Sequence, residues 1–225
     1  MSAGEYLNKE WHPAFEEYCE AIFELQEDDI DTIRARVAER LKVSRPAVSE
    51  MTRKLAGAEL VVVAEGRLNL TVTGRRLAER VVRRHRLAER FLTDVLGLSW
   101  AESHHEAGKW EHVISERVEA AMVEVLGDPT TCPHGNPIPG SGYEPSPGVP
   151  LGSLSIGDAF IVRRIPEDLE WMPGMLEFLE ESGMVPGVEA QLTSLAADGT
   201  ADVNVSGGAV RLGPDCTSRL LVETA

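Results

Sequence analysis

Histidine and carboxylate side chains recur at helical spacing near the middle of this chain. His85 and Glu89 are four residues apart in a stretch with helical periodicity, so both project from one helical face. His104 falls on the next expected helix, and Glu111 and His112 come further along it. Imidazole and carboxylate groups together suit Mn²⁺, Fe²⁺, Co²⁺, Ni²⁺ or Zn²⁺. The residue types and their spacing therefore predict binding of a divalent transition metal.

The residues divide into two candidate centres. His85 and His104 with Glu89 form a sensible ligand set for one ion. Glu111 and His112, joined by Glu17 or Glu20 from the N-terminal helix, form the other. A lone histidine is more often a hydrogen-bonded core or surface residue, so the prediction depends on the whole set rather than on any member.

Basic residues are concentrated in one segment of an acidic chain. The 225 residues include 22 Lys and Arg against 37 Asp and Glu, a formal net charge of −15. Residues 31–90 alone hold 15 of the basic and seven of the acidic residues, a local net charge of +8, which leaves −23 on the remainder. Such a basic segment is the electrostatic footprint of nucleic-acid binding, although solvated Arg-rich helices would give the same count.

The basic segment has the element order of a winged helix-turn-helix. Apolar residues at helical spacing predict three helices between residues 15 and 55, and two short apolar runs at 60–63 and 68–72 predict a hairpin. Ser44 is the expected N-cap of the third helix, and Pro46 occupies its first turn. This order predicts a module that reads DNA.

The third helix is the expected recognition helix. Hydroxyl and backbone N–H groups at its start can hold phosphate, and Arg45 can reach phosphate or guanine. Few of the side chains there can make bidentate base contacts, so we expect DNA shape and thymine-methyl contacts to supply much of the specificity. The candidate DNA contacts are Arg34, Arg36, Ser44, Arg45, Pro46, Ser49, Arg53 and Arg67.

Two long helices are expected next, with apolar faces too wide for one small module to cover. The first runs from about residue 73 to 96, and the second begins after a capping box at Ser99 and Glu102 and runs to about 126. A helical dimer interface is the economical explanation. Residues 127–150 hold seven of the 13 prolines and five glycines, which predicts a linker that follows the surface. Beyond it, short strands and a brief helix predict a small SH3-like barrel.

The predicted fold class is therefore mainly α with small β. The expected domains are a winged helix-turn-helix domain over 1–74, a helical metal-binding and dimerisation domain over 75–142, a linker over 143–152 and an SH3-like domain over 153–225.

Other features restrict the class of protein. No apolar run approaches the roughly 18–20 residues of a membrane span, and the first residues lack a secretory signal, so a cytoplasmic protein is expected. Cys19, Cys132 and Cys216 are far apart, which disfavours a disulfide framework and a thiolate zinc site. Cys19 is expected to pack in the core. The histidines expected on the surface or in loops are His12, His105 and His134.

Four stretches resemble a known family: Arg34–Arg40, Arg84–Arg90, Trp110–Ser115 and Gly135–Gly140. They are similar to the diphtheria-toxin-repressor family of metal-dependent regulators, which includes iron-dependent and manganese-dependent repressors. The resemblance is continuous from about residue 15 to 142. It implies a homodimeric winged-helix repressor that binds double-stranded operator DNA, with two metal sites per chain and a C-terminal SH3-like domain.

The resemblance also implies roles for the ligand candidates. His85, Glu89 and His104 match the family's ancillary site, and Glu177 matches a ligand that reaches back to that site from the third domain. The primary, activating site is matched by Glu111 and His112, with Glu17 at a position where iron sensors carry Met and manganese sensors carry Asp, and Glu20 where many manganese sensors carry Glu.

One departure concerns the metal. Gly108 stands where iron sensors have Cys and manganese sensors have Glu, and it offers only its carbonyl. Because Glu17 and Glu20 are hard oxygen ligands and no sulfur ligand is expected, Mn²⁺ is favoured over Fe²⁺, with Co²⁺, Ni²⁺ and Zn²⁺ as in vitro substitutes.

The sequence thus predicts a metal-dependent repressor of metal-homeostasis genes, not an enzyme. The first alternative is a winged-helix regulator of another signal, with a weakened or structural metal site. The second is a metallohydrolase, against which no nucleophile or substrate pocket is apparent.

Overall fold

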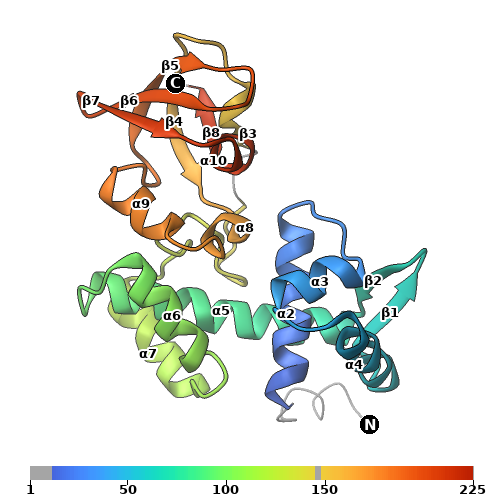
Figure 1. Ribbon diagram of the computed structural model, residues 1–225. Coiled ribbons are helices and arrows are strands. Elements are labelled where there is room, and N and C mark those ends of the chain that lie inside the picture. Colours follow the sequence, from blue (N-terminus) through green and yellow to red (C-terminus); the bar gives the residue numbers. More distant parts are fainter. Residues whose placement is uncertain (1–11, 145–147, 225) are drawn as a thin grey trace. The chain divides into compact units, whose positions relative to one another are not determined.

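The computed structural model describes residues 12–144 and 148–224. The chain divides into two compact units (Figure 1). The N-terminal unit contains the chain up to Arg84 together with Glu111–Ile114, and the C-terminal unit contains His85–Trp110 and the chain from Ser115 onward. Helix α5 (Val72–Asp94) contributes residues to both units.

The N-terminal unit is a winged helix-turn-helix, as predicted. Ser44 caps the third helix by accepting a hydrogen bond from the Ala47 N–H at 3.3 Å, and a proline follows in the first turn. Leucine, valine and isoleucine side chains of all the helices and of the hairpin share one core. The elements are α2 (Pro13–Glu27), α3 (Arg34–Arg40), α4 (Arg45–Gly57), β1 (Val61–Ala64), β2 (Arg67–Leu70) and the first part of α5.

The hairpin is closed by a two-residue turn. β1 and β2 are antiparallel, with Val61 opposite Leu70 and Ala64 opposite Arg67. The two turn residues, Glu65 and Gly66, have φ angles of 51° and 81°. Positive φ at both central residues matches the right-handed twist of the strands, so the wing is a regular tight hairpin.

The helix expected from the Ser99 capping box to about residue 126 is broken into two. α6 (Trp100–Trp110) ends before a turn over Glu111–Val113, and α7 (Glu116–Leu126) begins after it. The Ser115 side chain caps α7 by accepting from the Val118 N–H. The prediction of one continuous helix was wrong because this cap starts a new helix, and the break places two candidate metal ligands in a turn.

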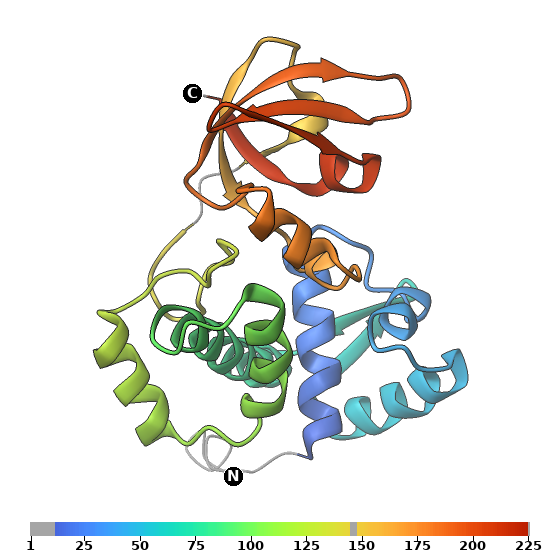
Figure 2. The same cartoon turned by 60° about the vertical axis from the view of Figure 1, so that its left-hand side comes forward.

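The C-terminal sheet curls into a small barrel (Figures 1 and 2). It has six antiparallel strands in the order β3-β8-β4-β5-β6-β7, which confirms the predicted SH3-like part. Its core includes Trp100 of α6, so barrel and α6 pack together. The elements are β3 (Val149–Pro150), η1 (Leu151–Ser153), β4 (Ala159–Arg164), α8 (Glu167–Glu170), α9 (Met175–Glu181), β5 (Glu189–Leu195), β6 (Ala201–Val205), β7 (Gly208–Leu212), α10 (Pro214–Arg219) and β8 (Leu221–Thr224).

The Pro- and Gly-rich segment does not run along the surface as a plain linker. Residues 132–136 are all buried. The backbone N–H of Ile165, just after β4, donates to the His134 carbonyl, and a Cβ added at Gly135 would lie 2.3 Å from the Arg163 carbonyl oxygen. Gly135 therefore permits a close approach of two backbones, and this approach seats the loop against the end of β4.

The three-domain division remains a prediction, because the two compact units are divided inside α5 rather than after residue 74. Within the described residues, no helix is both long and apolar enough to cross a bilayer.

Candidate metal centres

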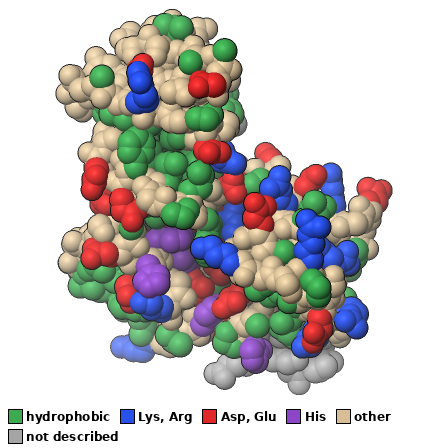
Figure 3. Space-filling model, viewed as in Figure 1, with side chains coloured by type: hydrophobic (Ala, Val, Ile, Leu, Met, Phe, Trp, Pro, Cys, Tyr) green, Lys and Arg blue, Asp and Glu red, His purple; other side chains and the backbone are tan. Residues whose placement is uncertain are grey.

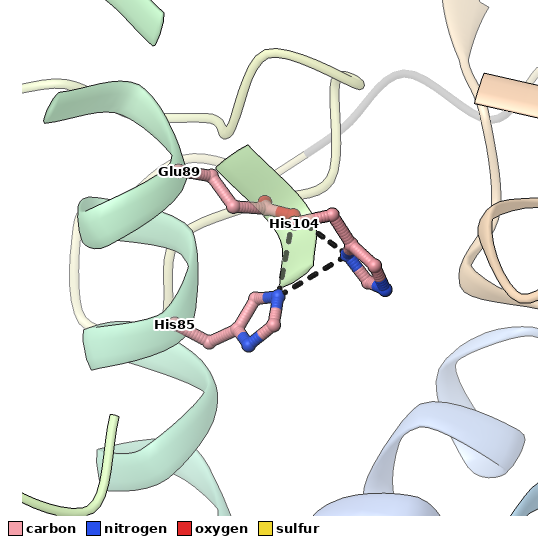
Figure 4. Close-up of side chains that lie close together, drawn as sticks. All are labelled: His85, Glu89 and His104. Atoms are coloured by element: carbon pink, nitrogen blue, oxygen red, sulfur yellow. Dashed lines mark hydrogen bonds and ion pairs between the residues drawn. The ribbon is translucent and has the colours of Figure 1, made fainter. Parts of the chain in front are cut away.

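The C-terminal unit gathers His85, Glu89 and His104 as predicted (Figure 4). His85 and Glu89 project from one face of α5, and His104 reaches them from α6. Glu89 Oε1 lies 3.2 Å from His85 Nε2 and 2.9 Å from His104 Nδ1, and the two nitrogens are 3.4 Å apart. One carboxylate oxygen thus has two imidazole nitrogens beside it.

Two residues that the sequence analysis did not select complete this cluster. His134, from the buried loop, has Nδ1 2.9 Å from Glu170 Oε2 and 3.6 Å from Glu89 Oε1. Glu170, from α8, also lies 3.4 Å from His104 Nδ1. We call these five residues the buried centre: His85, Glu89, His104, His134 and Glu170. His134 lies in a loop, as expected, but it is not on the surface, because its side chain is fully enclosed.

Cys132 adds a sulfur atom next to this centre. Its Sγ, a Glu89 oxygen and a His134 nitrogen lie within 4.8 Å of one another. Burial and the charges of Glu89 and Glu170 raise the pKa of the thiol well above its ordinary value. A bound cation would be needed to favour the thiolate, because burial and the neighbouring carboxylates disfavour a further negative charge. Cys19, by contrast, packs in the N-terminal core as predicted.

Buried polar groups hold the carboxylates of α8 in place. Asn136 Nδ2 donates to Glu170 Oε1 at 2.6 Å and to the Ile165 carbonyl at 3.0 Å. Arg86, the largest fully buried side chain, donates to Glu167 Oε1 at 2.9 Å and to the Pro137 carbonyl at 2.6 Å. The α8 carboxylates are thus fixed by residues from α5 and from the loop.

The charges of the buried centre compensate one another. Burial alone would raise the pKa of Glu170, but the charge of His134 and the hydrogen bonds of His104 and His134 lower it to about 2. Burial likewise opposes a charged His104, yet its contacts with Glu170 and Glu89 raise its pKa to about 10. The pKa of His134 is raised in the same way, so His104 and His134 carry protons that neutralise the carboxylates.

The donor set of the buried centre fits a divalent cation. Glu89 Oε2 and His134 Nε2 are buried and make no hydrogen bond within the described residues. Unpartnered buried polar atoms are costly, and they are expected where a ligand or ion completes the site. A cation in contact with these atoms would replace the imidazole protons as the compensating charge.

Glu177 does not reach this centre. It lies exposed on α9, where Leu176 and Leu179 face the barrel core. The turn of α9 that buries these two leucines directs Glu177 to solvent, whereas Glu170 of α8 reaches the histidines. Of these two carboxylates, Glu170 is the one that contacts the histidines, and the role of Glu177 as a ligand stays a prediction.

The N-terminal unit gathers a second set, which we call the turn centre: Glu16, Glu111 and His112. His112 Nδ1 lies 2.8 Å from Glu16 Oε2, and Nε2 lies 3.2 Å from Glu111 Oε1. The hydrogen bond with Glu16 raises the pKa of His112. Burial opposes this shift, and the charge of Glu111 adds to it. α2 and the turn after α6 therefore meet through one imidazole.

Glu16, rather than Glu17, is the α2 residue nearest to His112. The Glu17 side chain is 53% exposed, and its Oε1 is 4.0 Å from His112 Nε2. Glu16 and Glu20 lie on the buried face of α2, one turn apart. The family resemblance predicted that α2 supplies a side chain to this centre, but it named Glu17 instead of Glu16. Gly108 lies in α6, where an added Cβ would meet nothing within 4 Å, so packing does not require a glycine.

The predicted DNA-contacting residues lie on the surface of the N-terminal unit. Figure 3 shows Lys and Arg side chains gathered over the helix-turn-helix and the hairpin, with few on the visible barrel surface. The exposed candidates at the N-cap and along α4 are Ser44, Arg45, Pro46, Ser49 and Arg53. Their solvent exposure leaves this face of α4 available for a ligand.

The flanking candidates are partly engaged with acidic neighbours. Arg67 pairs with Asp31 at 2.8 Å, Arg36 pairs with Glu39 at 2.9 Å, and Arg34 is half-buried. Glu50, a carboxylate on the recognition face, pairs with Lys54 at 2.9 Å, which offsets its repulsion of phosphate.

The sequence held a weak signal for the residues that the sequence analysis did not select. Cys132 and His134 flank a proline in a Pro- and Gly-rich segment, and both residue types bind metals. Their burial depends on contacts with α8 and β4, so spacing alone did not reveal it. Glu170 is one of many acidic residues in its segment and carries no distinguishing pattern.

Comparison with known proteins gives two family matches along the chain. Residues 12–67 match the model described as "Iron dependent repressor, N-terminal DNA binding domain". Residues 71–140 match "Iron dependent repressor, metal binding and dimerisation domain". Together these matches span more than half of the 225 residues.

Individual relatives match over most of their length. The chain is 42% identical over 200 residues to the iron-dependent repressor IdeR of Mycobacterium tuberculosis, covering 84% of this chain and 87% of the relative. It is 38% identical over 218 residues to the diphtheria toxin repressor of Corynebacterium glutamicum, covering 92% and 95%. A solved manganese-dependent transcriptional repressor in complex with manganese superposes with a TM-score of 0.84 at 33% identity, covering 94% of this chain and all of that one.

Proposed function

The chain belongs to the diphtheria-toxin-repressor family of iron- and manganese-dependent repressors, and from this membership we propose how it senses its metal. It is a metal-dependent, DNA-binding transcriptional repressor and not an enzyme. The proposal is that each chain binds two divalent ions, one at the turn centre and one at the buried centre. The observation that supports it is the convergence, in each unit, of imidazole and carboxylate groups from separate elements.

The turn centre is the proposed regulatory site. Glu16 belongs to α2, whose buried residues share a core with α4, the helix that carries the proposed DNA contacts. Glu111 and His112 lie in the turn that leads into α7. A bound ion supplies a fixed divalent charge here. Glu16, Glu111 and His112 would hold it, and by doing so would fix α2, and through the shared core α4, against the turn.

The helix after the turn is the proposed site of dimer contact. α7 exposes a stripe of apolar residues, including Val118 and Val125, that are 46% and 63% exposed. A second copy of the chain that covered this stripe would place two recognition helices on one DNA duplex, about one helical turn or a multiple apart. Ordering of α2 relative to the turn would then set the spacing of the two helices.

The metal preference differs between the centres. The turn centre offers oxygen and nitrogen atoms, which suits Mn²⁺ and also Fe²⁺. Mn²⁺ was favoured in the absence of a sulfur ligand, but Cys132 lies beside the buried centre. The buried centre therefore accepts softer ions, including Fe²⁺ and Zn²⁺, more readily than the turn centre. We propose Mn²⁺ as the preferred activator, with Fe²⁺ next.

An anaerobic titration tests this proposal. Mn²⁺ and Fe²⁺ are added side by side to apo protein, and the affinity for duplex DNA enriched from a random pool by the Mn²⁺-loaded protein is measured. We expect DNA affinity to rise with either ion, and at a lower concentration of Mn²⁺. DNA binding that is independent of both ions would overturn the proposed function, and activation at a lower concentration of Fe²⁺ would overturn the preference.

A further inference from the structure

A row of buried carboxylates lines α2 in the N-terminal unit. Glu16, Glu20 and Glu24 follow one another at four-residue intervals, and each residue is less than 9% exposed. Buried carboxylates are stable only with compensating positive charge. Glu24 has such a partner in Arg40, whose guanidinium lies 3.3 Å away and is equally buried. Cationic side chains therefore stabilise the acidic face of α2.

Arg80 of α5 is the cation next to Glu16. Its Nη2 lies 3.3 Å from Glu16 Oε1, while the other carboxylate oxygen, Oε2, is 2.8 Å from His112 Nδ1. The Arg80 side chain is 27% exposed, and its Nε is buried without a hydrogen-bond partner within the described residues. Both oxygens of a proposed metal ligand are thus already occupied, one of them by a permanent positive charge.

We propose that Arg80 is an internal competitor for the metal at the turn centre. This inference rests on the proposed function, because it takes Glu16, Glu111 and His112 as metal ligands. A divalent ion held by Glu16 would lie within a few ångströms of the guanidinium, and an arginine does not lose its proton at any physiological pH. Arg80 must therefore give up Glu16 when the ion binds, and its partial exposure allows the guanidinium to turn toward solvent.

The competition raises the metal concentration that is needed to fill the turn centre, and it does not change which metal is preferred. Breaking the Arg80–Glu16 ion pair weakens the binding of every divalent ion by the same factor. Without metal, the same ion pair compensates Glu16 and so stabilises the apo protein. Loss of the Arg80 charge should therefore tighten metal binding and destabilise the apo form, two effects that a purely structural arginine would not combine.

The test compares Arg80→Gln with Arg76→Gln in the full-length chain. Arg76 is one turn earlier on α5, is exposed and forms no ion pair within the described part of the chain, so its replacement controls for net charge. Both variants and the parent protein carry His85→Ala, which removes a ligand of the buried centre. Mn²⁺ affinity is measured by calorimetry, and melting temperature is measured with and without Mn²⁺.

We expect Arg80→Gln to lower the Kd for Mn²⁺ about five- to tenfold and to lower the apo melting temperature, so that Mn²⁺ raises the melting temperature by more than in the parent. Arg76→Gln should have the same Kd for Mn²⁺ and the same melting temperatures, with and without Mn²⁺, as the protein that carries only the background substitution. An unchanged or higher Kd in Arg80→Gln would overturn the inference, because Arg80 would then be a structural residue or one that positions Glu16. If Arg80→Gln does not fold, Arg80→Met is measured with the same expectation.

Glu111→Gln in the same background separates the two possible failures. If Mn²⁺ binding persists in Glu111→Gln at parental affinity, the turn centre is not the metal site and the proposed function fails with the inference. If Glu111→Gln abolishes binding but Arg80→Gln does not tighten it, the proposed function stands and only the competitor role of Arg80 is overturned.

Discussion

The buried centre and the turn centre use the same residue types in opposite surroundings. Glu89, His134 and Glu170 are almost completely enclosed and are held by a loop, α5 and α8. In the turn centre, His112 lies in a three-residue turn between helices and is partly exposed. An enclosed set with fixed ligands is preorganised for an ion, whereas a set that spans a helix and a turn changes shape when it binds one. We therefore expect the buried centre to stabilise the fold and the turn centre to change DNA affinity when metal binds.

The largest expected effect is the loss of charge compensation in the buried centre. His134→Ala removes the group whose charge most strongly lowers the pKa of Glu170 and Glu89, leaving two enclosed carboxylates under-compensated. We expect the free energy of unfolding of the apo protein to fall by roughly 3–5 kcal/mol, measured by urea denaturation. His105→Ala, on the exposed face of α6, should change it by less than about 0.5 kcal/mol. Equal effects of the two substitutions would show that His134 does not compensate the enclosed carboxylates.

The turn centre should show the opposite behaviour. Glu111→Gln should reduce metal-dependent DNA affinity about 100-fold, which corresponds to about 2.7 kcal/mol, because α2 loses its link to the turn. The same variant should remain a folded dimer by light scattering and circular dichroism. His85→Ala should weaken metal activation less than Glu111→Gln. A larger loss in His85→Ala would reverse the roles of the two centres.

The pH dependence of metal binding sharpens the comparison. Coordination requires neutral imidazole, and the pKa of His104 is raised to about 10, so at neutral pH an ion must displace a proton from the buried centre. Affinity at this centre should fall about tenfold for each pH unit below neutrality per displaced proton, measured by calorimetry in buffers of different ionisation enthalpy. Affinity that is constant between pH 6 and 8 would show that the imidazoles are already neutral.

The stability of the apo protein should fall as the pH rises above neutrality, whereas metal affinity should rise. The folded pKa of His104 lies above the ordinary 6.5, so its contribution to stability is complete below about pH 6.5 and is lost as the pH rises toward 10. The folded pKa of Glu170 is about 2, so its contribution is complete above about pH 4.5 and is lost as the pH falls toward 2. These two contributions are therefore both complete between about pH 4.5 and 6.5.

The smallest expected effect concerns Gly108. Gly108→Ala adds a methyl group into open space in a helix, so the protein should gain up to about 1 kcal/mol in stability, seen as a higher melting temperature. The Kd for Mn²⁺ should not change, because alanine adds no ligand atom. A weaker affinity in Gly108→Ala would show that the backbone at this position contributes to binding.

The elements and one ligand set could be predicted from sequence. The helical spacing of His85 and Glu89, the cap at Ser44 and the hairpin of the wing are local patterns, and the structure has all three. The resemblance located α2 as a source of metal ligands. It did not identify Glu16, since neighbouring residues on a helix differ by about 100° in direction and only packing decides which one faces the turn.

The sequence by itself determined the helices and the hairpin of the N-terminal unit, the basic DNA-binding segment and the α5 residues of the buried centre, because periodicity, capping and charge are encoded within a few residues. Only the tertiary structure decided that His134 and Glu170 join them and that Arg80 meets Glu16. These contacts connect residues that are far apart in sequence, such as Arg80 and Glu16 at a separation of 64. A polar residue in a loop is buried only when distant partners supply its hydrogen bonds and compensate its charge, and no local pattern specifies those partners.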